Sequence, residues 1–367
     1  MTRWNATPDA VAQTVLDDLR RRLSEFRRVR VPRGFGWQRG VDGDYLADLI
    51  DYWATGYDWR QHEAGVLSLP WTLSAVNAET PIRAIHQRAG TRTAAVLLLH
   101  GWPDSVLRFQ KLLPLLHDLD VVIPALPGFP FAAPVARGGL SAAAMADAVA
   151  ATMADLGYGR YVVSAGDVGC DVAEALADRH GAGVAALHLS DVSQYRYLVD
   201  PPTDLTEAER DYMEHGHRWQ DAEGGYMHLQ RTKPHTVAVA LGDSPAGLAA
   251  WLVEKLRSWT DCDGDVEAVF TRDELLTWIT AYWVSGAIGT SFTPYVEGGT
   301  KPRERLNIPT AFTIFPQDLV NAPREFAERF FDVRSWVEPP SGGHFAAWEC
   351  PLDYAAGVRA AVALAGH

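Results

Sequence analysis

Residues 161–170, which read YVVSAGDVGC, carry the strongest fold signal in the sequence. A short apolar run comes first, typical of a buried parallel strand, and a helical pattern continues from the turn to about Arg179. An alanine and two glycines flank Asp167, and residues this small are needed where a sharp turn presses its backbone against a neighbouring strand and helix. The stretch therefore predicts a strand, a tight turn and a helix, with the side chain of Asp167 exposed at the turn.

Further strands and helices alternate on both sides of this stretch. A helix is predicted from Ser141, as its N-cap, to Gly157. The other apolar runs that predict strands are Val96–Leu99, Val121–Pro124, Val184–Leu189, Thr310–Phe315 and Val333–Val337. Such alternation is typical of a doubly wound, mostly parallel α/β sheet.

Two regions depart from this alternation. In residues 1–92, Thr7 is predicted to cap a helix that starts at Pro8, a second helix spans Tyr45–Trp53, and the rest is irregular. Residues 191–308 are helical and rich in Trp and Tyr, and 118 residues are too many for a loop. We therefore predict an N-terminal extension (1–92), a first core part (93–190), an inserted helical lid (191–308) and a second core part (309–367).

Composition excludes several classes of function. The 46 Asp and Glu against 33 Lys and Arg give a net charge of −13, so no basic face is available for nucleic acid or an anionic membrane. The three cysteines are far apart, which fits neither a disulfide framework nor a zinc site, and we expect a cytoplasmic protein. His215 and His217 lack further ligands at metal-site spacing, and no dinucleotide or phosphate fingerprint occurs, so no metal or cofactor is predicted.

Three side chains follow predicted strands in the order nucleophile, acid, histidine: Asp167, Asp318 and His344. All three would reach the carboxyl edge of the sheet. The turn His100–Pro103 follows the first core strand and could place the backbone N–H of Trp102 beside that of Val168. Two such N–H groups would form an oxyanion hole.

An aspartate nucleophile cannot form an acyl enzyme, but it can displace a leaving group from a saturated carbon and leave an alkyl ester on the enzyme. Water activated by a histidine then hydrolyses that ester. If the leaving group is an epoxide oxygen, it needs a proton donor such as tyrosine. From the residues alone, Tyr226 and Tyr295 cannot be preferred over Tyr212 and Tyr282.

Motifs along nearly the whole chain resemble the microsomal-type epoxide hydrolases, which are α/β-hydrolases with a characteristic N-terminal domain. The matching stretches are 18–23 (DLRRRL), 52–60, 100–105 (HGWPDS), 225–230 (GYMHLQ), 243–250 (DSPAGLAA), 282–283, Tyr295 and 342–349 (GGHFAAWE). The resemblance implies an α/β-hydrolase fold that needs no cofactor and acts on a small-molecule epoxide. We expect a bacterial member without the membrane anchor of the animal enzymes.

The same resemblance implies a role for each site residue. Asp167 attacks the epoxide, Tyr226 and Tyr295 donate to its oxygen, and His344 with Asp318 activates the water. Trp102 and Val168 provide the backbone oxyanion donors.

The sequence departs from the family pattern at three positions. Val168 and Ala165 stand where a tryptophan and a glycine are usual, which implies a wider pocket floor, and Asp318 is glutamate in some members.

Alternatives remain open at this point. A haloalkane dehalogenase shares the aspartate nucleophile but commonly has a tryptophan directly after it, where this chain has Val168. A ligand-binding or biosynthetic relative could keep the fold without hydrolysis. Asp191 also follows a core strand and competes with Asp318 as the acid.

The substrate is predicted to be a bulky epoxide, aromatic or polycyclic, because the lid is rich in tryptophan. The indoles that could wall such a pocket, unless most of them simply form the core of the lid, are Trp219, Trp251, Trp259, Trp278 and Trp283. Detoxification and the tailoring of a natural product are equally compatible with the sequence, as are a monomer and a homodimer.

Overall fold

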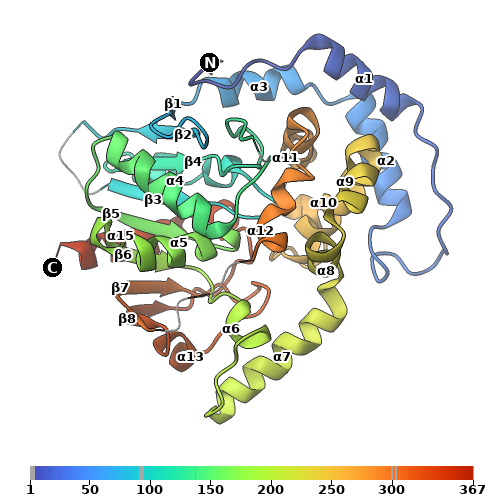
Figure 1. Cartoon of the computed structure of the whole chain (residues 1–367). Helices are drawn as coiled ribbons and strands as arrows, with labels where there is room; N and C mark the ends of the chain where they lie inside the picture. The colour runs from blue at the N-terminus through green and yellow to red at the C-terminus, as the bar shows by residue number, and fades with distance from the viewer. Residues whose placement is uncertain (1–4, 91–94, 137, 299–300, 302–303, 367) are drawn as a thin grey trace.

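The core of the molecule is one eight-stranded sheet with the strand order β1-β2-β4-β3-β5-β6-β7-β8 (Figure 1). The computed structural model describes residues 5–90, 95–136, 138–298, 301 and 304–366. The strands are β1 (Trp71–Ser74), β2 (Ile82–Gln87), β3 (Ala95–Leu99), β4 (Asp120–Pro124), β5 (Tyr161–Ala165), β6 (Val184–Leu189), β7 (Leu306–Thr313) and β8 (Phe331–Val337). Only β1 with β2 and β2 with β4 pair antiparallel; the remaining neighbours are parallel.

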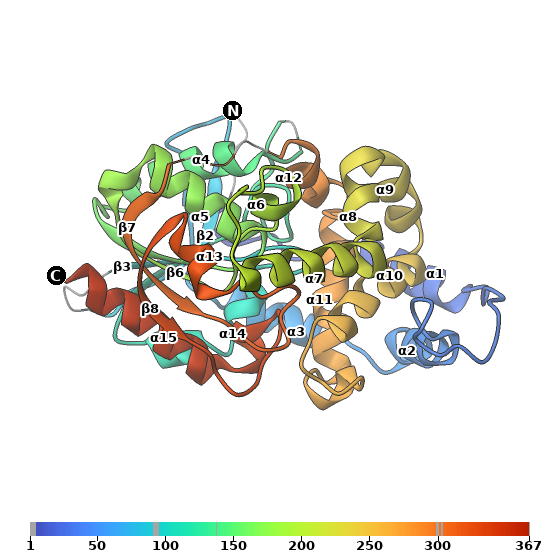
Figure 2. The ribbon, with the colours of Figure 1, turned by 90° about the horizontal axis from the view of Figure 1, so that it is seen from below.

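Helices cover both faces of the sheet, as its central strands require. Every residue of β3, β5 and β6 is buried, because a central parallel strand is covered on both faces. In Figure 2, α4 (Ala142–Asp155) and α5 (Val168–Arg179) lie above the strands and α15 (Pro351–Ala365) lies below them. The short elements of the core are η1 (Val106–Phe109), η2 (Leu113–Leu116), η3 (Gly181–Gly183), α13 (Arg324–Glu328) and α14 (Ala346–Glu349). The predicted doubly wound α/β fold is confirmed.

Between β6 and β7, the described residues form helices and turns without a strand. These elements, here called the lid, are α6 (Tyr195–Leu198), α7 (Glu207–Glu223), α8 (Gly225–Thr232), α9 (Pro234–Asp243), α10 (Pro245–Ser258), η4 (Val266–Ala268), α11 (Arg272–Ser285), η5 (Thr290–Phe292) and α12 (Thr293–Val296). Strand β7 already begins at Leu306, inside the range predicted for the lid, and ends at Thr313 rather than Phe315.

The N-terminal region differs from the prediction in its first helix. The N-terminal helices are α1 (Gln13–Ser24), α2 (Gly43–Thr55) and α3 (Trp59–Leu67). Helix α1 does not start at Pro8, and Thr7 is not its cap, because the chain before it is bound to α3. The N–H of Val11 donates to Glu63 Oε1 at 2.7 Å, and its carbonyl accepts from Arg60 Nη2 at 2.8 Å.

Strands β1 and β2 were not predicted either, since residues 1–92 were expected to be helical or irregular. Polar residues interrupt the apolar pattern of β2, but they are buried with partners of their own. Arg83 Nη1 donates to the Phe131 carbonyl at 2.9 Å, and His86 Nε2 lies 2.8 Å from the Tyr158 hydroxyl. The predicted boundary at residues 92 and 93 lies outside the described residues.

Helices α1 and α2 lie against the lid, although they are far from it in sequence (Figure 1). Both pack on α10. Arg22 Nη1 donates to the Asp243 carbonyl at 2.6 Å, and the Tyr52 hydroxyl donates to Asp273 Oδ1 at 2.8 Å. The N-terminal region therefore contributes two strands to the sheet and braces the lid from outside.

Within the described ranges, no single helix has both the length and the apolar character needed to cross a membrane. Helices α9 and α10 meet that test only as a pair, and the pair is bent by 114°.

Candidate active site

Asp167 lies at the turn between β5 and α5, in a backbone conformation that few residues other than glycine adopt. Its φ is 54° and its ψ is −134°. The turn is possible because its neighbours are small. A Cβ at Gly169 would lie 2.6 Å from the Leu99 carbonyl oxygen, so α5 can approach β3 only with glycine there.

The structure brings Asp167, Asp318, His344 and Trp102 together at the carboxyl edge of the sheet. His344 Nδ1 lies 2.7 Å from Asp318 Oδ1. On the other side of the ring, Nε2 lies 3.4 Å from Asp167 Oδ2, an ion-pair distance without the alignment of a hydrogen bond. The second oxygen of Asp167, Oδ1, accepts the backbone N–H of Trp102 at 2.7 Å. The exposed fractions of the three catalytic candidates are 11% for Asp167, 4% for Asp318 and 2% for His344, so their charges interact with little screening.

The environment holds this cluster in its charged form. Burial opposes ionisation of Asp167, but His344 and the backbone N–H groups of Trp102 and Val168 lower its pKa below the ordinary value. Burial likewise opposes ionisation of Asp318, whose pKa His344 lowers. For His344, burial lowers the pKa, but the carboxylates of Asp318 and Asp167 outweigh it and raise the pKa to about 10. The resting imidazole is therefore protonated at neutral pH.

Two lid tyrosines face the same cavity as Asp167: Tyr226 on α8 and Tyr295 on α12. Their ring centroids are 6.2 Å apart, and the ring of Tyr226 stacks on Trp102 at 5.2 Å. Burial and the nearby charge of Asp167 raise the pKa of both hydroxyls well above the usual 10, so both remain proton donors.

The other two tyrosines are engaged elsewhere. The Tyr282 hydroxyl donates to the Asp104 carbonyl at 3.0 Å, and Tyr212 packs against Tyr197 and Phe326. Neither lines the cavity. Of these four tyrosines, Tyr226 and Tyr295 are thus the two that line the cavity with Asp167.

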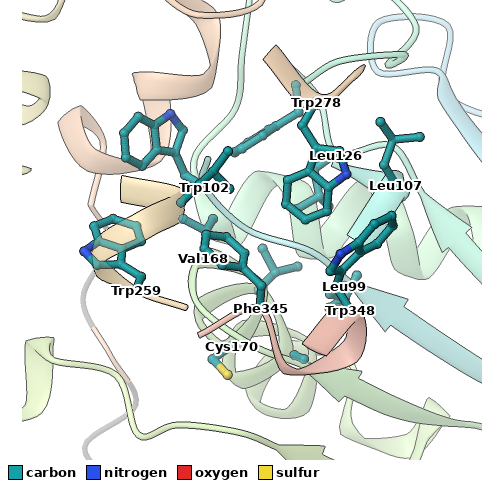
Figure 3. Packing of buried hydrophobic residues seen from close by; sticks show 14 of the residues in the cluster. Leu99, Trp102, Leu107, Leu126, Val168, Cys170, Trp259, Trp278, Phe345 and Trp348 are labelled. Atoms are coloured by element: carbon teal, nitrogen blue, oxygen red, sulfur yellow. The ribbon is translucent and has the colours of Figure 1, made fainter. Parts of the chain in front are cut away.

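The cavity has a volume of about 630 Å³. Asp167, Val168 and Asp318 contribute to its core side, and Tyr195, Tyr226 and Tyr295 to its lid side. None of the five lid tryptophans expected near the pocket lines it. Trp259 and Trp278 are instead packed into the hydrophobic core, where the ring of Trp259 lies beside that of Trp102 (Figure 3).

The Asp191 side chain lies next to the backbone of Asp167 rather than next to His344. Its Oδ2 lies 3.3 Å from the backbone nitrogen of Asp167, and no hydrogen bond joins it to His344 among the described residues. Burial and the charge of Asp318 raise its pKa to about 7. The geometry therefore pairs His344 with Asp318.

Comparison with known proteins agrees with this architecture. Residues 7–109 match the family described as "Epoxide hydrolase N terminus", and residues 94–222 match "alpha/beta hydrolase fold". A protein of Stigmatella aurantiaca named "Putative epoxide hydrolase" is 37% identical, with 95% of this chain and 82% of that protein covered. The chain belongs to the epoxide hydrolase family. Epoxide hydrolase 1 of Sus scrofa is 29% identical, with 94% of this chain and 85% of that protein covered.

Solved epoxide hydrolases have the same fold over nearly the whole length. The juvenile hormone epoxide hydrolase of the silkworm Bombyx mori superposes with a TM-score of 0.86 at 27% identity, covering 97% of this chain and 93% of that one. The epoxide hydrolase of Aspergillus niger gives a TM-score of 0.86 at 24% identity, covering 99% and 96%, and shows likeness of fold.

Several residues around the site of this epoxide hydrolase were not singled out from the sequence. Arg108 is fully buried and joins the Trp102 turn to the histidine loop: Nη1 donates to Asp104 Oδ2 and Nη2 to the His344 carbonyl, at 2.7 and 2.6 Å. Asp104 and Glu349 do lie in the quoted motifs 100–105 and 342–349, but position in a motif did not show what they bind. Within the described part of the chain, no three His, Cys, Asp or Glu side chains are grouped as metal ligands.

Proposed function

We propose that this epoxide hydrolase opens its substrate to a vicinal diol through a covalent ester on Asp167. The observation that carries the proposal is the position of the Asp167 carboxylate. One oxygen is bound by the Trp102 N–H, the other lies 3.4 Å from His344, and the group faces a cavity that two tyrosine hydroxyls share. A nucleophile and two proton donors thus line one cavity, and the base His344 lies against the nucleophile.

In the first half-reaction, Asp167 Oδ2 attacks an epoxide carbon and the carbon–oxygen bond of the ring breaks. Oδ1 stays on the Trp102 N–H and becomes the carbonyl oxygen of the ester. The alkoxide takes a proton from Tyr226 or Tyr295, both of which are protonated donors. The proton that leaves the His344 imidazolium through solvent restores the tyrosine.

Ester formation itself prepares the base for the second half-reaction. The carboxylates of Asp318 and Asp167 together raise the pKa of His344 to about 10. Esterification removes the charge of Asp167, so the pKa of His344 falls and the imidazole loses its proton more readily. Asp318 remains on Nδ1 and keeps Nε2 directed at the ester.

Water then attacks the carbonyl carbon of the ester, and His344 Nε2 accepts its proton. The oxyanion develops on Oδ1, where the N–H groups of Trp102 and Val168 stabilise it. The intermediate expels the diol oxygen, which takes the proton back from His344. The Asp167 carboxylic acid finally protonates His344 and restores the resting ion pair, so atoms and charge balance over the cycle.

The substrate we infer is a bulky epoxide. The support is now the cavity volume of about 630 Å³ and the tyrosine rings on its lid side, since the tryptophans lie elsewhere. Detoxification and biosynthesis both suit such a substrate.

A single turnover in heavy-oxygen water, with enzyme in excess over substrate, tests the covalent route. We expect the first diol to carry ordinary oxygen taken from Asp167, and the enzyme to gain heavy oxygen at that residue. A first diol labelled from solvent would mean that water attacks the epoxide directly, and the proposal would be wrong.

A further inference from the structure

We propose that Glu349 is a positioning residue for the hydrolytic half-reaction. Its carboxylate holds the loop around His344 (residues 342–345, the histidine loop) against the chain that follows lid helix α10. This inference rests on the ester mechanism proposed above. Glu349 does not line the cavity, so any effect it has on chemistry must pass through the histidine loop.

The carboxylate of Glu349 accepts three backbone N–H groups from two parts of the chain. Phe345 N donates to Oε1 at 2.8 Å, and Gly343 N donates to Oε2 at 3.0 Å, so the two residues that flank His344 are both bound. The third donor, Asp261 N at 2.8 Å from Oε2, belongs to the lid just after α10. The side chain of Glu349 thus joins the histidine loop to the lid.

The remaining backbone N–H groups of residues 342–345 are bound as well. Gly342 N donates to Asp261 Oδ2 at 2.8 Å, and His344 N donates to the Trp259 carbonyl at 2.8 Å. On the opposite side, the His344 carbonyl accepts Arg108 Nη2. A Cβ at Gly343 would lie 2.6 Å from the Trp259 carbonyl oxygen, so loop and lid are in direct contact.

The lid residue in this contact, Trp259, packs against three residues of the site. The ring of Trp259 lies 5.2 Å from His344, 5.0 Å from Tyr226 and 6.1 Å from Trp102, measured between ring centroids. Trp259 also stacks on Phe345, with the two ring centroids 6.4 Å apart. The loop that Glu349 binds therefore sets how far the base His344 lies from the proton donor Tyr226 and from the oxyanion turn at Trp102.

Three N–H donors require a group that only accepts, and an ionised carboxylate is such a group. Glutamine has nearly the same shape but would turn an amide N–H₂ toward at least one of the three N–H groups. Burial raises the pKa of Glu349 to about 7 against the opposing effect of the three donors, so the carboxylate is mostly ionised only above that pH.

The two half-reactions depend on the loop to different degrees. Attack on the epoxide uses Asp167 and the tyrosines, whereas ester hydrolysis requires Nε2 to be aligned on a water and on the ester carbon. A misplacement of about 1 Å at such a base can cost about 100-fold in rate. We therefore expect Glu349→Gln to slow ester hydrolysis by about 10- to 100-fold and to change the alkylation rate by less than about 2-fold.

Rapid mixing with an aryl epoxide that the wild-type enzyme turns over, such as styrene oxide, followed by intact-protein mass measurement, separates the two rates. The expected result for Glu349→Gln is accumulation of the covalent adduct at a normal rate of formation. Glu328→Gln, an exposed glutamate on α13, is the matched control and should behave as wild type. Equal slowing of both half-reactions, or unchanged hydrolysis, would overturn the inference.

Two further variants keep the test decisive. Asp261→Asn removes the carboxylate acceptor of Gly342 N and leaves Glu349 in place, so it should also slow hydrolysis selectively, even if Glu349→Gln does not fold; the melting temperature of each variant reports folding. His344→Gln should trap the adduct. If His344→Gln forms no adduct, the ester mechanism is wrong. If His344→Gln forms the adduct but neither Glu349→Gln nor Asp261→Asn slows ester hydrolysis, only the role of Glu349 is wrong.

Discussion

At the scale of single residues, the site depends on unfavourable features that its neighbours compensate. Asp167 has a positive φ and is largely buried, yet the His344 imidazolium and the backbone N–H groups of Trp102 and Val168 keep its pKa low. Burial, together with the charge of Asp167, raises the pKa of Tyr226 and Tyr295 and keeps both hydroxyls protonated. Each group is therefore in the protonation state that the proposed first step requires.

The identity of the acid is a prediction at this scale. Asp318→Asn should reduce ester hydrolysis by about 10²- to 10⁴-fold, because the imidazolium would lose its charged partner at 2.7 Å. Asp191→Asn should have a much smaller effect, since Asp191 contacts the backbone of Asp167 instead. Decay of the adduct in single-turnover mixing measures both, and the reverse order of effects would contradict the assignment.

The tyrosine pair gives a second prediction. The double variant Tyr226→Phe, Tyr295→Phe should lower the alkylation rate by about 10²- to 10⁴-fold, because the alkoxide would lack a donor. Each single variant should lose less, since the other hydroxyl remains. Tyr52→Phe, which removes a hydroxyl outside the cavity, serves as control. Normal alkylation by the double variant would show that the two hydroxyls are not the donors.

At the scale of elements, the site depends on how closely α5 approaches β3. Gly169→Ala would set a Cβ 2.6 Å from one backbone oxygen and 2.9 Å from another, so we expect a loss of about 2 kcal/mol of stability together with reduced activity. Gly65→Ala on α3 meets no atom within 4 Å and should instead stabilise by about 0.5–1 kcal/mol. Urea unfolding of both variants is the measurement. A neutral Gly169→Ala would mean that the helix can shift without cost.

A buried histidine in the sheet, His188, should make the stability of the fold depend on pH. His188 on β6 lies 2.8 Å from the Ser164 hydroxyl of β5 and 3.0 Å from the Thr313 hydroxyl of β7, and burial lowers its pKa to about 3. The unfolded chain binds this proton near pH 6.5 and the native chain only near pH 3. Stability is therefore lost as pH falls through that window, by at most about 1.4 kcal/mol per pH unit from this group.

Urea unfolding at pH 7, 6 and 5 tests this link. His188→Asn should be less stable than wild type at pH 7 but should lose stability less steeply on acidification. Parallel pH profiles of variant and wild type would show that His188 is not responsible.

At the scale of the whole molecule, the N-terminal region is part of the core rather than an appendage. Strands β1 and β2 extend the sheet beyond β4, while α1 and α2 pack on α10 of the lid. The N-terminal region thus contacts the lid through its first helices and the sheet of the core through its strands.

A chain that lacks residues 1–87 is therefore expected not to fold. It would expose the β4 edge and the lid face now covered by α1 and α2. Circular dichroism and size-exclusion chromatography should show no cooperative unfolding and an aggregated species. Cooperative unfolding with full activity would contradict this view of the N-terminal region.

The sequence by itself determined the parallel strands of the sheet, from β4 to β8, and the edge at which the candidate site residues meet. Buried parallel strands need continuous apolar runs, as in β3 and β5, and side chains that follow such strands meet at one edge, as Asp167, Asp318 and His344 do. Periodicity is a local property, so it can be read without knowing the partners.

Only the tertiary structure decided the features that depend on contacts between residues far apart in the chain. Strand β2 is hidden in the sequence because its polar residues Arg83 and His86 are buried with hydrogen-bond partners far along the chain. Helix α1 starts late because Glu63 binds the chain before it. Packing likewise placed Tyr226 and Tyr295, but none of the lid tryptophans, at the cavity. These outcomes depend on contacts between residues far apart in the chain, and such contacts leave no period in the sequence.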